Sequence, residues 1–290
     1  MAPKPGGGYP DVSACVAVNE VVNETMRTEQ LDAVRCDLAE EQRALDDVVA
    51  PMSDDEWQLA TSSPGWNVAD QIGHLTYFDA SATTAIASPD DFHAGLSELY
   101  EGTGAQGLDQ YTLGRFRELA PREQLSSWRK SRRNLMDAAD SLRESDRIAW
   151  YGPSMGAASF LTARLMETWA HGTDVVDALG ADRPATNRLR HIARLGFMTR
   201  RWSYTVGGEE PPAGDVRLDL TSPTGDRWTF GDESAADTVR GSAEEFCLVV
   251  TQRRHVDDTS IETSELGRHW LLRAQAFAGG PSYGPQARSS

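Results

Sequence analysis

The sequence predicts an α+β protein in which a bundle of four helices is followed by a small α+β domain. Two observations lead to this prediction. Up to about residue 183, apolar residues recur every three to four positions, which is typical of amphipathic helices. Beyond residue 184 the spacing changes, around 216–230, to the alternation of strands separated by turn residues. A length of 290 residues leaves room for two such domains.

The first part is expected to hold four helices. One covers 29–49 and ends at Pro51. The second begins after the turn at Pro64, with Asn67 as its N-cap and Asp70 three residues later, as in a capping box. A glycine-rich acidic linker at 96–108 leads to a third helix at 121–142. The fourth covers 158–179, and Gly180 ends it. Medium-length connections between such helices favour an antiparallel bundle.

The second part begins with a helical stretch that reaches about residue 202. Residues 216–220 and 227–230 alternate like strands around turn residues at 222–226, which predicts a hairpin. Helical patterns return at 242–254 and 265–277. We therefore expect a disordered lead-in at 1–28, the bundle at 29–183, the α+β domain at 184–280 and a loose tail at 281–290.

Composition narrows the classes of function. A hydrophobic fraction of 39% and a charged fraction of 25% are ordinary for a soluble protein. No stretch has the roughly 18 consecutive apolar residues of a membrane span, and the first residues lack a secretory pattern, so we expect a cytoplasmic protein. The net charge of −16 disfavours nucleic-acid binding. Cys15, Cys36 and Cys247 form no CxxC pair, which argues against disulfides and a cysteine zinc site.

The candidate site is a metal centre. Glu167 and His171 stand four apart on a predicted helix, so they share one face. A carboxylate and an imidazole placed in this way can bind one ion, and His74 is a candidate third ligand. Two histidines and one glutamate leave an open position on a zinc-type ion, which is the catalytic pattern. Asp174 continues the stripe and is expected to orient His171. The alternatives are a polar pair on a solvated face and a hydrogen-bonded buried His74.

These residues also carry a resemblance. The runs Pro-Gly-Trp-x-Val-x-Asp-x-x-x-His74-Leu and Glu167-Thr-Trp-x-His171-Gly-x-Asp174 resemble the metal-binding pattern of the DinB-like superfamily. Within it, the chain is similar over about 29–280 to mycothiol-dependent maleylpyruvate isomerases and related mycothiol S-transferase-like metalloenzymes. The resemblance implies a DinB-like four-helix bundle followed by a small α+β domain.

The resemblance further implies a divalent metal, usually zinc, held by His74, Glu167 and His171. The metal would activate the thiolate of mycothiol, a low-molecular-weight thiol cosubstrate. That thiolate would serve isomerisation, or S-transfer and thiol exchange, on a small electrophilic or thiol-conjugated metabolite, including one of specialised metabolism. The family's second domain supplies an arginine near the metal, for which Arg253 is the best match and Arg254 the alternative. Arg164 is a candidate for cofactor binding, and solvated helix-end charges are the plain alternative for Arg253 and Arg254.

Several points stay open at this level. The segment 240–255 looks characteristic of a subgroup of this family rather than of the maleylpyruvate enzyme itself. The resemblance therefore supports the metal ligands more strongly than it supports a particular substrate. The thiol can be mycothiol, bacillithiol or glutathione, and the ligand set suits zinc, nickel or iron. A metal-assisted hydrolase and a non-catalytic metal- or ligand-binding regulatory protein are the rival functions. The protein is expected to be a monomer or a homodimer, with no nucleic-acid or membrane partner.

Overall fold

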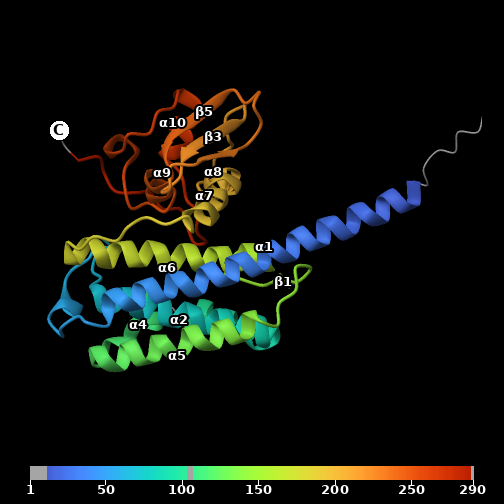
Figure 1. Cartoon of the computed structure of the whole chain (residues 1–290). Helices are drawn as coiled ribbons and strands as arrows, with labels where there is room; N and C mark the ends of the chain where they lie inside the picture. Colours follow the sequence, from blue (N-terminus) through green and yellow to red (C-terminus); the bar gives the residue numbers. More distant parts are fainter. Residues whose placement is uncertain (1–11, 103–106, 289–290) are drawn as a thin grey trace, which may run out of the picture.

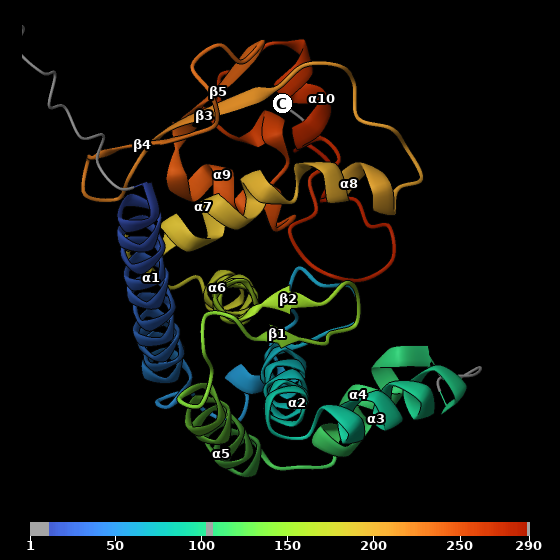
Figure 2. The same cartoon turned by 90° about the vertical axis from the view of Figure 1, so that its right-hand side faces the viewer.

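The computed structural model describes residues 12–102 and 107–288, and the side chains of 30–99 and 107–288. Its first half contains four long helices that pack against one another, with two shorter helices beside them (Figures 1 and 2). The long helices are α1 (Val12–Val49), α2 (Val68–Ala87), α5 (Pro121–Ala139) and α6 (Ala157–Leu179); the shorter ones are α3 (Pro89–Gly102) and α4 (Gly107–Arg117); the 3-10 turn η1 is Glu56–Gln58. Helix α1 packs on α6 and α5, and α2 packs on α5, α6 and α4. The predicted four-helix bundle is therefore present.

Helix α1 is longer than the sequence pattern indicated. It begins at Val12, so residues 12–28, which we assigned to a disordered lead-in, continue the helix, and residues 1–11 lie outside the described part of the chain. The reason is that neither glycine nor proline occurs between Pro10 and Pro51, so nothing in the backbone chemistry interrupts the helix.

The ends of the two helices that carry the candidate site follow the predicted local chemistry. The Asn67 side chain accepts a hydrogen bond from the Asp70 backbone N–H, and the Asp70 carboxylate accepts one from the Asn67 backbone N–H, so the capping box is present. Helix α6 ends at Gly180, which adopts the left-handed conformation with φ of 60° that glycine takes without a steric penalty. These caps fix where α2 and α6 begin and end.

The prediction of a linker at 96–108 is wrong for the described residues of that range, 96–102 and 107–108, which are helical. Helix α3 extends to Gly102, and α4 begins at Gly107. Phe92, Leu96 and Leu99 are spaced four and three apart and turn one face inward, where Phe92 and Leu99 are buried. The glycines suggested a linker, but this apolar spacing decides the conformation because it lets the helix bury a face.

The second half contains a three-stranded sheet and short helices, which lie against α6 (Figure 2). Its elements are α7 (Leu189–Met198), α8 (Arg200–Val206), β3 (Val216–Thr221), β4 (Arg227–Phe230), β5 (Asp237–Ser242), α9 (Ala243–Val250), η2 (Val256–Asp258) and α10 (Glu265–Leu271). Strands β3 and β4 form the predicted antiparallel hairpin, with Leu218 opposite Phe230. Strand β5 was not predicted; it pairs with β3 in parallel and places Val239 beside Leu218. The protein is thus α+β, as the sequence predicted.

Further features differ from the sequence prediction, including the ends of α9 at Val250 and of α10 at Leu271 where helix was expected to 254 and 277. The helical stretch that reaches about 202 is divided at Thr199 into α7 and α8. A small hairpin of β1 (Arg147–Ile148) and β2 (Met155–Gly156) precedes α6. The tail also makes defined contacts over 281–288, because the Gln252 Nε2 group donates to the Ser282 carbonyl at 2.8 Å and the Arg288 N–H donates to Asp258.

One apolar core joins the two halves. Leu38 of α1, Leu165 of α6, Ile192 of α7 and Phe246 of α9 belong to the same buried cluster. Burial of this shared surface holds the second half against α6, the helix that carries two of the three candidate ligands. None of the described helices combines the length and the apolar character that a membrane crossing requires.

Candidate metal centre

The three predicted ligands meet between two helices. His74 comes from α2, and Glu167 and His171 come from successive turns of α6. The Glu167 Oε2 atom lies 3.1 Å from His171 Nε2 and 3.6 Å from His74 Nε2. One donor atom from each residue lies within 4.8 Å of the other two, which is the spacing of ligands around a single ion.

A glutamine that the sequence analysis did not single out fixes the orientation of His171. The Thr61 hydroxyl donates to the Trp66 carbonyl, so its oxygen accepts from Gln71 Nε2 at 2.8 Å. The amide orientation then presents Gln71 Oε1 to His171 Nδ1 at 2.5 Å. His171 therefore carries its proton on Nδ1, and its Nε2 lone pair faces Glu167. Gln71 lies three residues before His74 on α2, and that spacing was the one signal available in the sequence.

The electrostatics keep the set in the protonation states that a metal needs. Burial, together with the neighbouring His171, lowers the pKa of His74 to about 4, so His74 is neutral at pH 7. Burial by itself would raise the pKa of Glu167, but the adjacent imidazoles of His171 and His74 hold that pKa well below its usual value. The Glu167 carboxylate thus faces the Nε2 lone pair of His171 and the neutral imidazole of His74.

The donor chemistry of these residues fits a divalent metal. With Nδ1 protonated, His171 Nε2 and Glu167 Oε2 are both hydrogen-bond acceptors, yet they stand only 3.1 Å apart. A cation between them relieves this repulsion, and nitrogen and carboxylate ligands suit zinc and several other divalent ions. His74, Glu167 and His171 are the residues that would hold it.

Aromatic rings border the ligands. The Trp66 ring stacks on His171 at a centroid distance of 6.1 Å and lies 5.2 Å from His74. Phe78, one turn after His74 on α2, lies 4.5 Å from the His74 ring. These rings hold the imidazoles in place and lower the local polarity, which strengthens every charge interaction at the centre.

Asp174 contacts an arginine more closely than it contacts His171. Its Oδ2 atom lies 3.9 Å from His171 Nδ1 but accepts a hydrogen bond from Arg253 Nη2 at 2.8 Å. Its other oxygen accepts from the Ser62 hydroxyl at 3.0 Å, and Arg253 Nη1 also donates to the Thr251 carbonyl. Asp174 therefore positions Arg253, which reaches the centre from the turn that follows α9.

The other two predicted arginines differ in placement. Arg164 is buried on α6 one turn before Glu167, where its Nε and Nη2 groups donate to the buried carboxylate of Asp79. Among the described residues no hydrogen bond uses Arg164 Nη1. Arg254 instead pairs with Asp177 on the outer part of α6 and does not line the cavity at the ligands.

The ligands open onto a cavity of about 670 Å³, which we call the metal cavity. The triad, Arg164 and Arg253 line it together with Phe78, Trp150 and Tyr151. The segment 277–280, which follows α10, covers one side. A volume of this size accommodates a small molecule with a polar end. No sequence pattern marks this segment as part of the site, because its contribution depends on how the second half packs on α6.

Comparisons with known proteins identify the family of the chain. Residues 38–176 match the family described as the mycothiol maleylpyruvate isomerase N-terminal domain. Two proteins of Mycobacterium tuberculosis, from strains CDC 1551 and H37Rv and both named as uncharacterized, are 43% identical to the chain over 251 residues, which is 86% of this chain and 96% of theirs.

Two crystal structures share the fold. They are those of the mycothiol-dependent maleylpyruvate isomerase and of a mutant of it, each with a TM-score of 0.54, at 17% and 16% identity and with 82% of this chain and 92% of theirs covered. The resemblance that the two sequence motifs suggested is thereby confirmed. The chain belongs to the family that carries the mycothiol maleylpyruvate isomerase N-terminal domain, within the DinB-like superfamily.

Proposed function

We propose that the protein is a divalent-metal enzyme, most simply a zinc enzyme, that uses mycothiol for isomerisation or S-transfer on a small electrophilic or thiol-conjugated metabolite. The observation that supports this proposal above all is the convergence of His74, Glu167 and His171 on one cavity that Arg253 also lines. Three protein ligands leave a coordination position open to a small molecule, which distinguishes a catalytic site from a closed structural one.

The ligand residues would act as a preorganised set. A divalent ion bound by them supplies a Lewis acid that favours the thiolate form of a thiol at neutral pH. Gln71 keeps the Nδ1 proton on His171, so that Nε2 stays available, and the low pKa of His74 keeps that imidazole neutral. The ionised Glu167 and the neutral His74 are thus in the forms that bind a metal at pH 7.

Arg253 would stabilise negative charge on the substrate. Addition of a thiolate to an electrophile moves charge onto a carbonyl or carboxylate oxygen, and a fixed cation beside that oxygen lowers the barrier. Asp174 and the Thr251 carbonyl hold the guanidinium of Arg253, so little motion is needed when the charge develops. Arg164 would offer Nη1 as a second donor to the same cavity.

Isomerisation and S-transfer require the same features of the active site. Each requires an electrophile held near the thiol and protected from bulk water. The aromatic side chains of Phe78, Trp150 and Tyr151 line the metal cavity and provide that protection. The difference between the two reactions is whether the thiol leaves after bond rotation or stays on the product, and that depends on the substrate.

The first test is metal content by elemental analysis of the wild-type protein and of Glu167→Gln. About one metal per chain is expected in the wild type, and the variant should lose it. Glu118→Gln, a change of the same kind at an exposed position on the segment after α4, should keep it. A wild-type protein that binds no zinc, nickel, iron or cobalt with measurable affinity would contradict the proposal.

The second test concerns the thiol. Cobalt-substituted protein should change its visible absorption when mycothiol is added, and turnover of maleylpyruvate or of mycothiol conjugates should require the thiol. Arg253→Lys should lower kcat much more than it changes metal content, because lysine lacks the planar fork that Asp174 holds. Thiol-independent turnover of an ester or amide would point instead to metal-assisted hydrolysis.

A further inference from the structure

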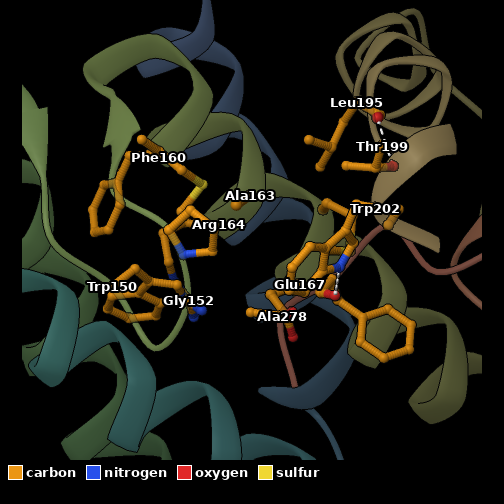
Figure 3. A pocket seen from close by; sticks show the side chains of 15 residues that line it. Trp150, Gly152, Phe160, Ala163, Arg164, Glu167, Leu195, Thr199, Trp202 and Ala278 are labelled. Atoms are coloured by element: carbon orange, nitrogen blue, oxygen red, sulfur yellow. Dashed lines mark hydrogen bonds between the residues drawn. The ribbon is translucent and has the colours of Figure 1, made fainter. Parts of the chain in front are cut away.

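A second pocket of about 220 Å³ adjoins the metal cavity, and we call it the apolar pocket (Figure 3). Arg164, Met166 and Glu167 of α6 line both spaces, so the two meet at the ligand-bearing helix. Figure 3 shows Trp150 and Phe160 on one side of the apolar pocket and Leu195 with Trp202 on the other. The pocket therefore lies between the bundle and the second half.

The walls of the apolar pocket present carbon rather than hydrogen-bonding groups. The Trp202 indole N–H is already used by the Phe277 carbonyl at 3.2 Å, and the Thr199 hydroxyl donates to the Leu195 carbonyl at 2.9 Å (Figure 3). Trp150 meets Phe160 edge to face at 5.2 Å and offers its ring. Polar groups that are satisfied by neighbouring backbone do not attract a polar ligand, so these walls favour an apolar one.

The polar groups of the pocket are confined to its junction with the metal cavity. Glu167 is one of the metal ligands, and Arg164 is neutralised as a charge by its pairing with Asp79. Because Asp79 already pairs with the charge of Arg164, the Nη1 donor of Arg164 suits a neutral carbonyl of the ligand better than it suits a carboxylate. A ligand in this pocket has its apolar group among the aromatic and aliphatic side chains and its polar end beside Glu167.

The size of the pocket sets the size of that group. An engineered apolar cavity of about 150 Å³ stays dry and binds benzene. The apolar pocket, at about 220 Å³, has room for a larger group, such as a phenyl ring with a short alkyl chain. A small dicarboxylate would leave this volume unfilled and would place a charge against carbon.

We propose that the substrate of this enzyme carries an aromatic or alkyl group of roughly this size, which the apolar pocket binds while the reacting carbonyl end lies at the metal centre. The placement of the reacting end at the metal centre rests on the proposed function. The binding of an apolar group rests only on the residues that line the apolar pocket. Met155 of β2 and Ala163 of α6 face the pocket from different elements, and selectivity depends on the space that they leave.

The test is calorimetric titration of the wild-type protein with benzene, toluene and propylbenzene, and with maleate as a dicarboxylate probe. Each added methylene should raise the affinity about fourfold until the pocket is full. Met155→Trp should lower the affinity for propylbenzene at least tenfold because the indole occupies the pocket. Met198→Trp, the same substitution at a position that is 58% exposed on α7, should bind like the wild type.

Two further variants distinguish loss of binding from misfolding, and pocket binding from metal binding. Ala163→Phe fills the pocket from α6 instead of β2, so it should lose binding even if Met155→Trp fails to fold. Glu167→Gln should lose the metal and still bind propylbenzene, which separates this proposal from the proposed function. Absence of alkylbenzene binding in the wild type would overturn the proposal, as would binding that survives in both filled variants or a preference for maleate over propylbenzene.

Discussion

Replacing Gln71 by leucine should weaken metal binding without removing a ligand. The substitution deletes the acceptor that lies 2.5 Å from His171 Nδ1 and leaves that N–H without a partner in a buried position. An unsatisfied buried donor costs about 1–3 kcal/mol. Loss of the partner that orients a metal-bound histidine lowers metal affinity about 10–100-fold, which corresponds to about 1.4–2.7 kcal/mol. The two magnitudes agree, so we expect the Kd for zinc to rise by one to two orders of magnitude.

The assay is a competition titration of zinc against a chromophoric chelator, with circular dichroism as a check on folding. Gln71→Glu keeps an oxygen at the same reach and should restore at least the wild-type affinity. Gln124→Leu removes another buried glutamine, one that donates to the Phe116 carbonyl and not to a metal ligand, and should leave the Kd unchanged. A folded Gln71→Leu protein with the wild-type Kd would refute the role assigned to this hydrogen bond.

The remaining predictions concern the scaffold of the site. Asn67→Ala removes the N-cap of α2 and should lower the free energy of unfolding in urea by about 1 kcal/mol; an unchanged midpoint would contradict the cap. For Asp46, burial by itself would raise the pKa, but its two arginine partners lower it below the usual value, so its stabilisation is present above the unfolded pKa near 4 and is lost as pH falls through the folded pKa. Asp46→Asn should therefore be about 1–2 kcal/mol less stable than the wild type at pH 7, and the difference should shrink in melts below about pH 4; a difference constant with pH would argue against the linkage. Gly196→Ala places a Cβ 2.8 Å from Val250 Cγ2 at the contact of α7 with α9, and should lower Tm by an amount equivalent to about 1–3 kcal/mol; an unchanged Tm would show that this contact relaxes freely.

The start of α2 and the end of α6 were readable from the sequence because they depend on neighbours within a few residues. The capping box of Asn67 and Asp70 and the glycine at 180 are local chemistry, and both are present. The spacing of Glu167 and His171 is equally local, since residues four apart share a helix face whatever surrounds them. The linker at 96–108 failed as a prediction because glycine content was weighed above apolar spacing.

Strand β5 and the roles of the polar residues were not readable in this way. Strand β5 pairs with β3 in parallel across a connection that has no fixed sequence pattern, and its burial comes from α9 and α10. Asp174 was expected to orient His171, whereas its shortest contacts are with Arg253 and Ser62, which are 79 and 112 residues away in sequence. Such partners are selected by how helices and loops pack, so no spacing rule identifies them.

The sequence by itself determined the class of fold, the helix that bears Glu167 and His171, and the family to which the two motifs point, because helical periodicity and short motifs are set by local geometry. Only the tertiary structure decided that His74 joins that pair, that Gln71, 100 residues from His171, fixes its tautomer, and that an apolar pocket opens beside Glu167. The physical reason is that a cavity and a hydrogen bond between distant residues exist only after the shared apolar core has brought α2, α6 and the second half together.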